Sequence, residues 1–215
     1  MSDLIIKPSG TGANFKVQNP SGTDKIVMNS SGTITTGTLG SGVTFPAGHI
    51  IQTKFANYVG QQTVGDGSGT GTTFVTIGTG SGSGSEHSLA MSVSSGNKIL
   101  CIGTVNMSGS NRYSGIKVFS DSTQIGNGTT SGSRTSVTAS SDRNESETNA
   151  DHIVFPVAFS FVHTPSDTSS YTYAVKVGNT YTAAAYTYIN RTSTDGNGSY
   201  THNGISSFIL MEIAQ

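Results

Sequence analysis

The residues best suited to chemistry form one acidic cluster: Asp142, Glu145, Glu147 and Asp151. Several carboxylates in a flexible segment are the oxygen ligands that calcium prefers, and two carboxylates roughly 5–10 Å apart in a cleft can hydrolyse a glycosidic bond. No second feature of the segment points to a bound cation or to a cleft. The interpretation we favour is a solvated loop whose charges aid solubility, with no metal and no cofactor.

Histidine and cysteine offer little more. Five histidines are scattered along the chain: His49, His87, His152, His163 and His202. Each lies beside a predicted strand end, and a structural or solvated role is favoured over a ring of one histidine per subunit that binds a metal on a three-fold axis. The single cysteine, Cys101, lies in an apolar run over 98–102. It cannot form an intrachain disulfide, and we expect a buried, inert thiol.

The motifs of common enzyme classes are absent from the sequence. There is no Gly-x-Gly-x-x-Gly, no Gly-Lys pair, no Gly-x-Ser-x-Gly and no His-Glu-x-x-His. The net charge of −1 predicts no attraction to nucleic acid or to an anionic membrane. Neither a signal peptide nor an apolar run of about 18 residues is present, so we expect no export signal and no membrane insertion. We predict a protein without catalytic residues.

Tyrosine is concentrated near the end of the sequence, at Tyr171, Tyr173, Tyr181, Tyr186, Tyr188 and Tyr200. For the tyrosines in predicted strands we favour core and cross-strand packing over ligand contact. Tyr200 lies in a polar loop, where an aromatic face is better placed to contact another molecule.

Composition and periodicity predict an all-β protein. Charged residues make up 11% and hydrophobic residues 33% of a chain with 28 glycines and no tryptophan, and low charge argues against ordinary disorder. No segment has a sustained helical period, although a short helix over 142–150 is an alternative. The run 153–162 predicts a buried strand with Pro156 at a bend or an edge, and Gly178-Asn179 predicts a hairpin between 171–177 and 181–189. Short strands and turn-rich loops are typical of a jelly roll or β-sandwich.

The N-terminal part has a repetitive texture of its own. Short β-prone runs over 6–11, 17–23 and 27–33 each end in a Ser-Gly turn. Such units have too few apolar side chains to build a core, so we expect residues 1–48 to be an arm that packs on identical chains. Residues 49–215 form the predicted jelly-roll-like domain. Its last strand, 207–213, is apolar on both faces, and we expect both faces to be covered.

These features resemble small virion structural proteins of marine and freshwater tailed phages, of cyanophage type. The resemblance rests on the strand–Ser-Gly-Thr units, on the segment 37–49 (Gly-Thr-Leu-Gly-Ser-Gly-Val-Thr-Phe-Pro-Ala-Gly-His) and on the closing Ser-Phe-Ile-Leu-Met-Glu-Ile. It implies a homotrimer with a tumour-necrosis-factor-like jelly-roll knob, and it carries no catalytic residues. The arm would dock on other virion proteins, through Leu4, Ile5, Ile6, Phe15 and Val17.

Two classes of function remain open. The chain is either a virion-surface protein made in the host cytoplasm, as a short fibre or a capsid decoration, or a free-standing carbohydrate-binding β-sandwich or bacterial adhesin. The missing signal peptide and the repeat arm favour the virion. In a fibre, contact with a receptor such as a host glycan is expected from the polar loops, through Tyr200, Asp142, Glu145, Glu147 and Asp151.

Overall fold

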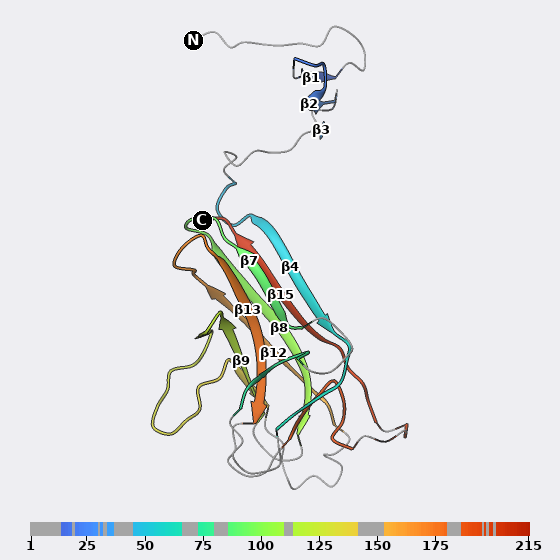
Figure 1. Ribbon diagram of the computed structural model, residues 1–215, viewed down its shortest axis with the longest axis vertical. Coiled ribbons are helices and arrows are strands. Elements are labelled where there is room, and N and C mark those ends of the chain that lie inside the picture. Colours follow the sequence, from blue (N-terminus) through green and yellow to red (C-terminus); the bar gives the residue numbers. More distant parts are fainter. Residues whose placement is uncertain are drawn as a thin grey trace. The chain divides into compact units, whose positions relative to one another are not determined.

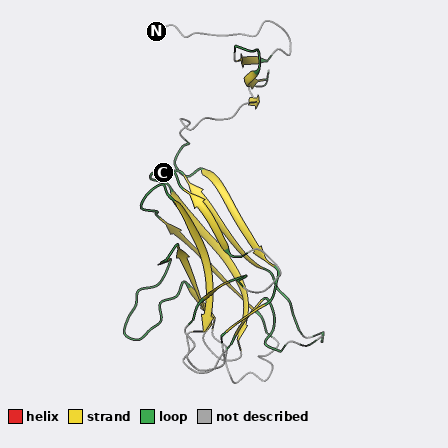
Figure 2. Cartoon of the chain, in the orientation of Figure 1, coloured by secondary structure: helices red, strands yellow, loops and turns green. Residues whose placement is uncertain are grey.

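The computed structural model describes residues 14–18, 20–29, 31, 34–36, 45–65, 73–79, 86–109, 114–141, 153–179, 186–194, 196, 198–199 and 201–215. The described part contains strands and loops without a helix, which confirms the all-β prediction (Figure 2). The predicted alternative of a helix over 142–150 lies outside the described residues. Within the described part, no helix is long and apolar enough to cross a membrane. The chain divides into two compact units, Met1–Phe45 and Pro46–Gln215.

The first unit contains a three-stranded antiparallel sheet in the order β1 (Phe15–Gln18), β2 (Asp24–Met28) and β3 (Ile34–Thr36). Gly22, between β1 and β2, has a φ of +80°, which is the left-handed conformation that a Ser-Gly turn requires. Val27 is buried, but Phe15, Val17, Ile26 and Met28 are 36–42% exposed. The small sheet therefore leaves most of its described apolar side chains in contact with solvent.

The second unit contains two six-stranded antiparallel sheets (Figure 1). The first, which we call the β8 sheet, has the order β4 (Ile50–Tyr58), β15 (Ser206–Ile213), β8 (Lys98–Gly109), β14 (Thr187–Ile189) and β5 (Gln62–Val64), with β12 (Phe155–His163) paired to β8. The second, the β9 sheet, has the order β10 (Thr123–Ile125), β9 (Ser114–Ser120), β13 (Ser170–Asn179) and β6 (Val75–Thr76). In that sheet β11 (Ala139–Ser141) pairs with β9, and β7 (Ser88–Ser92) pairs with β13.

The core lies between the two sheets, as in a β-sandwich. From Lys98 to Met107 buried and half-buried residues alternate along β8, and Ile99, Cys101 and Val105 are fully buried. They belong to one apolar cluster with Val175 and Val177 of β13, in the other sheet. The expectation of a buried Cys101 is confirmed, and burial raises the pKa of its thiol to about 12. At neutral pH the group is therefore a thiol, not the nucleophilic thiolate.

Glycine is required at one point of the β8 sheet. Gly103 pairs with Phe159 on one side and with Phe208 on the other. The two phenyl rings lie 6.2 Å apart between centroids, and a Cβ atom at Gly103 would be 2.3 Å from the Phe159 ring. Because Gly103 has no side chain, the rings of Phe159 and Phe208 can approach each other over its backbone on the inner face of the sheet.

Two predictions about strands are wrong. Gly178 and Asn179 are not a hairpin turn but the last residues of β13, paired with β9, and β14 lies in the other sheet. Gly178 serves close packing instead, because a Cβ atom there would be 2.7 Å from the Thr73 carbonyl oxygen. The strand predicted to be buried, β12, pairs only with β8 among the described strands and is buried only at Phe159. Its edge position accounts for Pro156, as the sequence predicted.

The last strand, β15, is central to its sheet, because it pairs with β4 and with β8 along most of its length. Phe208, Leu210 and Glu212 on its inner face are 0–1% exposed. The expectation that both faces are covered holds for this face only, since Ile209 and Met211 on the other face are only partly buried.

Glu212, although buried, is fully hydrogen-bonded. Its Oε1 accepts hydrogen bonds from the Ser94 backbone N–H and from Asn97 Nδ2, both at 2.7 Å, and Gln52 Nε2 donates to its Oε2 at 2.6 Å. Burial alone would raise the pKa of Glu212, but these hydrogen bonds outweigh burial and lower it. The carboxylate therefore links the end of β15 to β4 and to the turn between β7 and β8.

Candidate functional site

The residues that face outward from the β8 sheet form cross-strand rows. One row contains Thr53, Met211, Leu100 and Val162, from β4, β15, β8 and β12. The next contains Phe55, Ile209, Ile102 and Ser160, and beyond Met211 a shorter row contains Ile50, Ile213 and Lys98. Strand alternation thus places many of the large apolar side chains of four strands on one outer surface.

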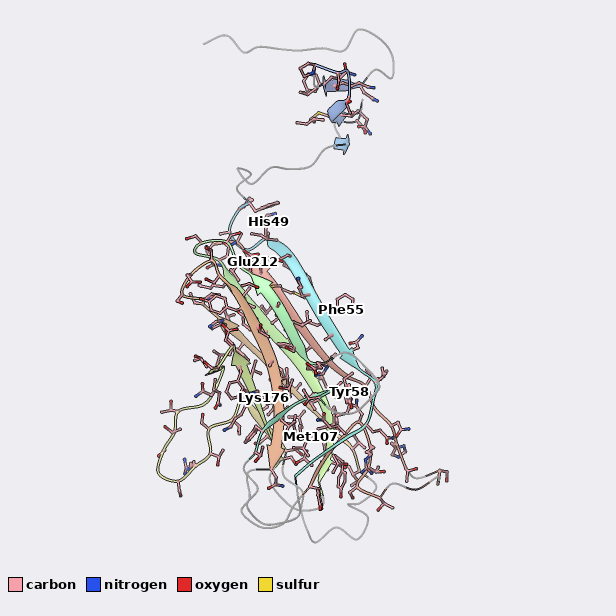
Figure 3. All side chains as sticks on the ribbon, in the orientation of Figure 1. His49, Phe55, Tyr58, Met107, Lys176 and Glu212 are labelled. Atoms are coloured by element: carbon pink, nitrogen blue, oxygen red, sulfur yellow. The ribbon has the colours of Figure 1, made fainter. Side chains whose placement is uncertain are left out.

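This surface is exposed to solvent. Phe55 is 71% exposed, Ile50 56% and Val162 54%, while the apolar residues of β15 and β8 between them are half-buried by their neighbours. Figure 3 shows the Phe55 side chain on β4 pointing away from the sandwich. We call the following set the outer apolar face: Ile50, Phe55, Leu100, Ile102, Val162, Ile209, Met211 and Ile213.

Charge and polarity limit what this face can bind. Lys98 is the only charged residue in the three rows, so the face lacks the basic groups that bind phosphate or an anionic lipid surface. Towards Ser206, the first residue of β15, the next row is more polar: it contains Asn57, Ser207, Thr104 and Ala158. The shortest apolar row contains Ile213, and the next residue, Ala214, accepts a hydrogen bond from Gly48 N–H at 2.9 Å. The apolar rows therefore lie towards the end of the sandwich where Pro46 and Gln215 are found.

Most of the predicted contact residues lie outside the part of the chain that the structure describes. Tyr200, Asp142, Glu145, Glu147 and Asp151 lie outside the described residues, and so do Leu4, Ile5 and Ile6 of the predicted docking arm. Phe15 and Val17 lie on β1 of the arm and are 36% and 42% exposed.

The histidines and tyrosines are mostly structural where they are described. His87 is fully buried between Tyr58 and Phe208, with ring centroids 6.4 and 6.3 Å away. Tyr173 is fully buried and Tyr171 is half-buried on the same strand, in agreement with the predicted core and cross-strand packing. Among the described residues, no group of three or more His, Cys, Asp or Glu side chains could hold a metal ion.

Sequence reasoning did not identify the outer apolar face. The alternation in β15 is visible in the sequence, but it predicts only that both faces of the strand are covered. The face is formed by strand pairing, which places Ile209 opposite Phe55 and Ile102. This alignment of distant segments depends on the strand order and register, which cannot be deduced from the sequence of one strand.

Comparison with known proteins does not assign the chain to a family: no protein-family model matches it, and no curated protein matches it either. Fold and surface together define an all-β protein, with a β-sandwich unit that carries an exposed apolar sheet face.

Proposed function

We propose that the chain is a non-enzymatic, self-associating surface subunit, and that it serves as a trimeric short fibre or capsid decoration on a tailed-phage particle. In this proposal the sandwich is a jelly-roll knob, and the unit before Pro46 is the arm that joins it to other virion proteins. The outer apolar face is the observation that carries self-association.

The apolar face favours copies of the same chain as the partner. Contiguous exposed apolar surface on a soluble protein commonly marks a contact with another protein, and closed rings of identical subunits are the usual way to bury it. Lys98 is the only charged residue in the three rows, so two copies of the face impose little charge repulsion on each other. Side chains such as Phe55 and Ile209 would then lose the solvent exposure that they have in one chain.

The arm supports the same conclusion independently. Its described sheet buries Val27 and leaves Phe15, Val17, Ile26 and Met28 partly in solvent. A unit of this size rarely buries enough apolar surface to be stable alone, and neighbouring arms would supply the missing contacts. A ring whose axis runs along the strands would keep all arms at one end, as docking on a particle requires.

Placement on a virion rests on the resemblance of the repeat arm and the closing strand to phage structural proteins. A free-standing adhesin is the alternative, and it would use the same sandwich without an arm docked on a particle. The two functions differ in where the protein is found, which a cryo-EM map of the parent particle would decide.

Replacing Ile209 and Met211 together with asparagine should separate the subunits without unfolding them. Wild-type protein should have about three times the chain mass of 22.1 kDa by light scattering. The double variant should weaken association by at least about a hundredfold, or about 2.7 kcal/mol, because both side chains lie centrally in the face. Circular dichroism should still show a cooperative melt.

The matched control is Thr53→Asn, which changes a polar residue in the same row as Met211. It should leave the trimer intact. A wild-type protein that is a stable monomer would refute self-association, and a double variant that remains fully trimeric would show that another surface holds the subunits.

Deleting residues 1–45 should detach the protein from the particle. The remaining unit, Pro46–Gln215, contains both six-stranded sheets and should fold by itself. Particles assembled with the deleted chain should lack it, as measured by immunoblot of purified virions, while full-length chain should complement. Retention of the deleted chain at the wild-type copy number would contradict the proposed role of the arm.

A further inference from the structure

A cavity of about 290 Å³ opens at one end of the sandwich, between the turn from β9 to β10 and the loop from β12 to β13. Its lining consists of Ser120, Asp121, Ser122, Thr123, Ile125, His163, Thr164, Ser166 and Tyr171. None of these residues belongs to the outer apolar face. The lining is rich in hydroxyl groups and also contains the Tyr171 ring, the His163 imidazole, the Ile125 side chain and the Asp121 carboxylate.

The carboxylate of Asp121 is held in place by the backbone. Asp121 N–H donates to the Thr172 carbonyl oxygen at 2.7 Å, and Thr172 N–H donates to Asp121 Oδ1 at 2.8 Å. Asp121 also has a φ of +52°, a left-handed conformation that is uncommon outside glycine and asparagine. The turn thus fixes an acceptor at the rim of the cavity.

The aromatic wall is fixed as well. The Tyr171 hydroxyl donates to Asp167 Oδ1 at 2.9 Å, and its ring meets the His163 ring edge-on at 6.4 Å between centroids. His163 Nδ1 lies 3.0 Å from the Tyr173 hydroxyl. Burial lowers the pKa of His163, so this imidazole is neutral at pH 7 and supplies no positive charge to the cavity.

Ser120 closes the inner side of the cavity but offers it no free group. The residue is only 5% exposed, and its hydroxyl is shielded from solvent beside Tyr173, with which it interacts through a side-chain hydrogen bond. The groups open to a bound molecule are therefore the Asp121 carboxylate and the exposed hydroxyls of Ser122 and Thr123.

We propose that this cavity binds one neutral pyranose unit. The volume corresponds to about ten water molecules, which suits a single sugar ring. Sugar hydroxyls pair with carboxylate and hydroxyl groups such as those of Asp121 and Ser122, and the C–H face of the ring packs on an aromatic side chain such as Tyr171. The carboxylate and the lack of a cation disfavour acidic sugars. One chain supplies the whole lining, so the site does not depend on the proposed self-association.

Ligand-observed saturation-transfer NMR on the full-length protein tests the site. Methyl α-glucopyranoside and methyl β-galactopyranoside are the neutral probes, and methyl glucuronide is the acidic one. Saturation should reach the ring protons of at least one neutral probe and not those of the glucuronide. Asp121→Asn tolerates the left-handed backbone and keeps an oxygen that can accept from Thr172 N–H, but it removes the charge, so it should weaken binding at least about tenfold with an unchanged melting temperature.

Ser122→Ala is the second variant. It removes an exposed hydroxyl of the lining, so stability should not fall, whereas sugar binding should weaken. Thr53→Asn, which lies on β4 outside the cavity, is the control for an unspecific change. Absence of transfer to both neutral probes at millimolar concentration would overturn the proposal, as would equal transfer to the glucuronide or unaltered binding by both test variants.

Discussion

Removal of residues 208–215 should leave a chain that does not fold, recovered in inclusion bodies and without a cooperative melt after refolding. The deletion takes out almost all of β15, whose residues pair with β4 on one side and β8 on the other. β4 would lose the strand with which it pairs, and the backbone groups of β8 that face β15 would lose their hydrogen-bonding partners. Exposed edges of this kind promote aggregation.

Side-chain burial makes the loss larger. Phe208 and Leu210 are 0% exposed, and each contributes about 1.5–3 kcal/mol when fully buried, before any cavity term is added. Glu212 adds three hydrogen bonds that hold β4 and the β7–β8 turn. Since a whole domain is stable by only about 5–15 kcal/mol, the remaining interactions should not suffice.

Deletion of Gln215 alone is the matched control. Its backbone N–H donates to Asn97 Oδ1 at 3.2 Å, but the side chain is exposed and the residue lies beyond β15. This variant should be soluble with nearly the wild-type melting temperature. A soluble, cooperatively melting protein after removal of residues 208–215 would show that β15 is dispensable.

The sequence predicted the elements of this protein better than their partners. Low charge, β-prone runs and Ser-Gly turns predicted the all-β class and the buried Cys101, because these depend on local composition and on strand alternation. The same alternation identified the terminal strand as a structural element. Each of these features can be deduced within about ten residues of chain.

Features that depend on distant pairing were not predictable. Gly178 looks like a turn residue in the sequence, but its lack of a side chain accommodates the Thr73 carbonyl oxygen, which lies in a segment about a hundred residues earlier. Likewise, the apolar run of β12 suggested burial, although pairing with β8 places it at the edge of its sheet. Tertiary contacts decide both cases.

The cavity was missed for the same reason. Asp121-Ser122 and His163-Thr164 are unremarkable pairs in the sequence, and only the pairing of β9 with β13 brings the first turn beside Tyr171. The predicted contact residues were chosen because they lie in polar loops. The Asp121-Ser122 pair between two β-prone runs indicates a turn, but the left-handed backbone of Asp121 and its place beside Tyr171 appear only in the structure.

His87 should make the protein sensitive to mild acid. The side chain is fully buried, its Nε2 lies 3.2 Å from the Ser206 carbonyl oxygen, and its Nδ1 has no partner among the described residues. Burial, only partly offset by the hydrogen bond to Ser206, lowers the pKa of His87 from 6.5 to about 4. Between these values the unfolded chain binds the proton and the folded chain does not, so stability rises with pH there.

The contribution of a neutral His87 is therefore complete above about pH 6.5 and is lost as the pH falls towards 4. The loss should reach roughly 3 kcal/mol, measured by urea unfolding at a fixed protein concentration. His87→Gln keeps a donor for the Ser206 carbonyl but cannot be protonated, so it should lose most of this pH dependence even if it is less stable at pH 7. If the free energy of unfolding of His87→Gln depends on pH as steeply as that of the wild type, other groups cause the acid sensitivity. Glu212 would be the first to examine, because its hydrogen-bonded carboxylate also stops stabilising the fold as the pH falls.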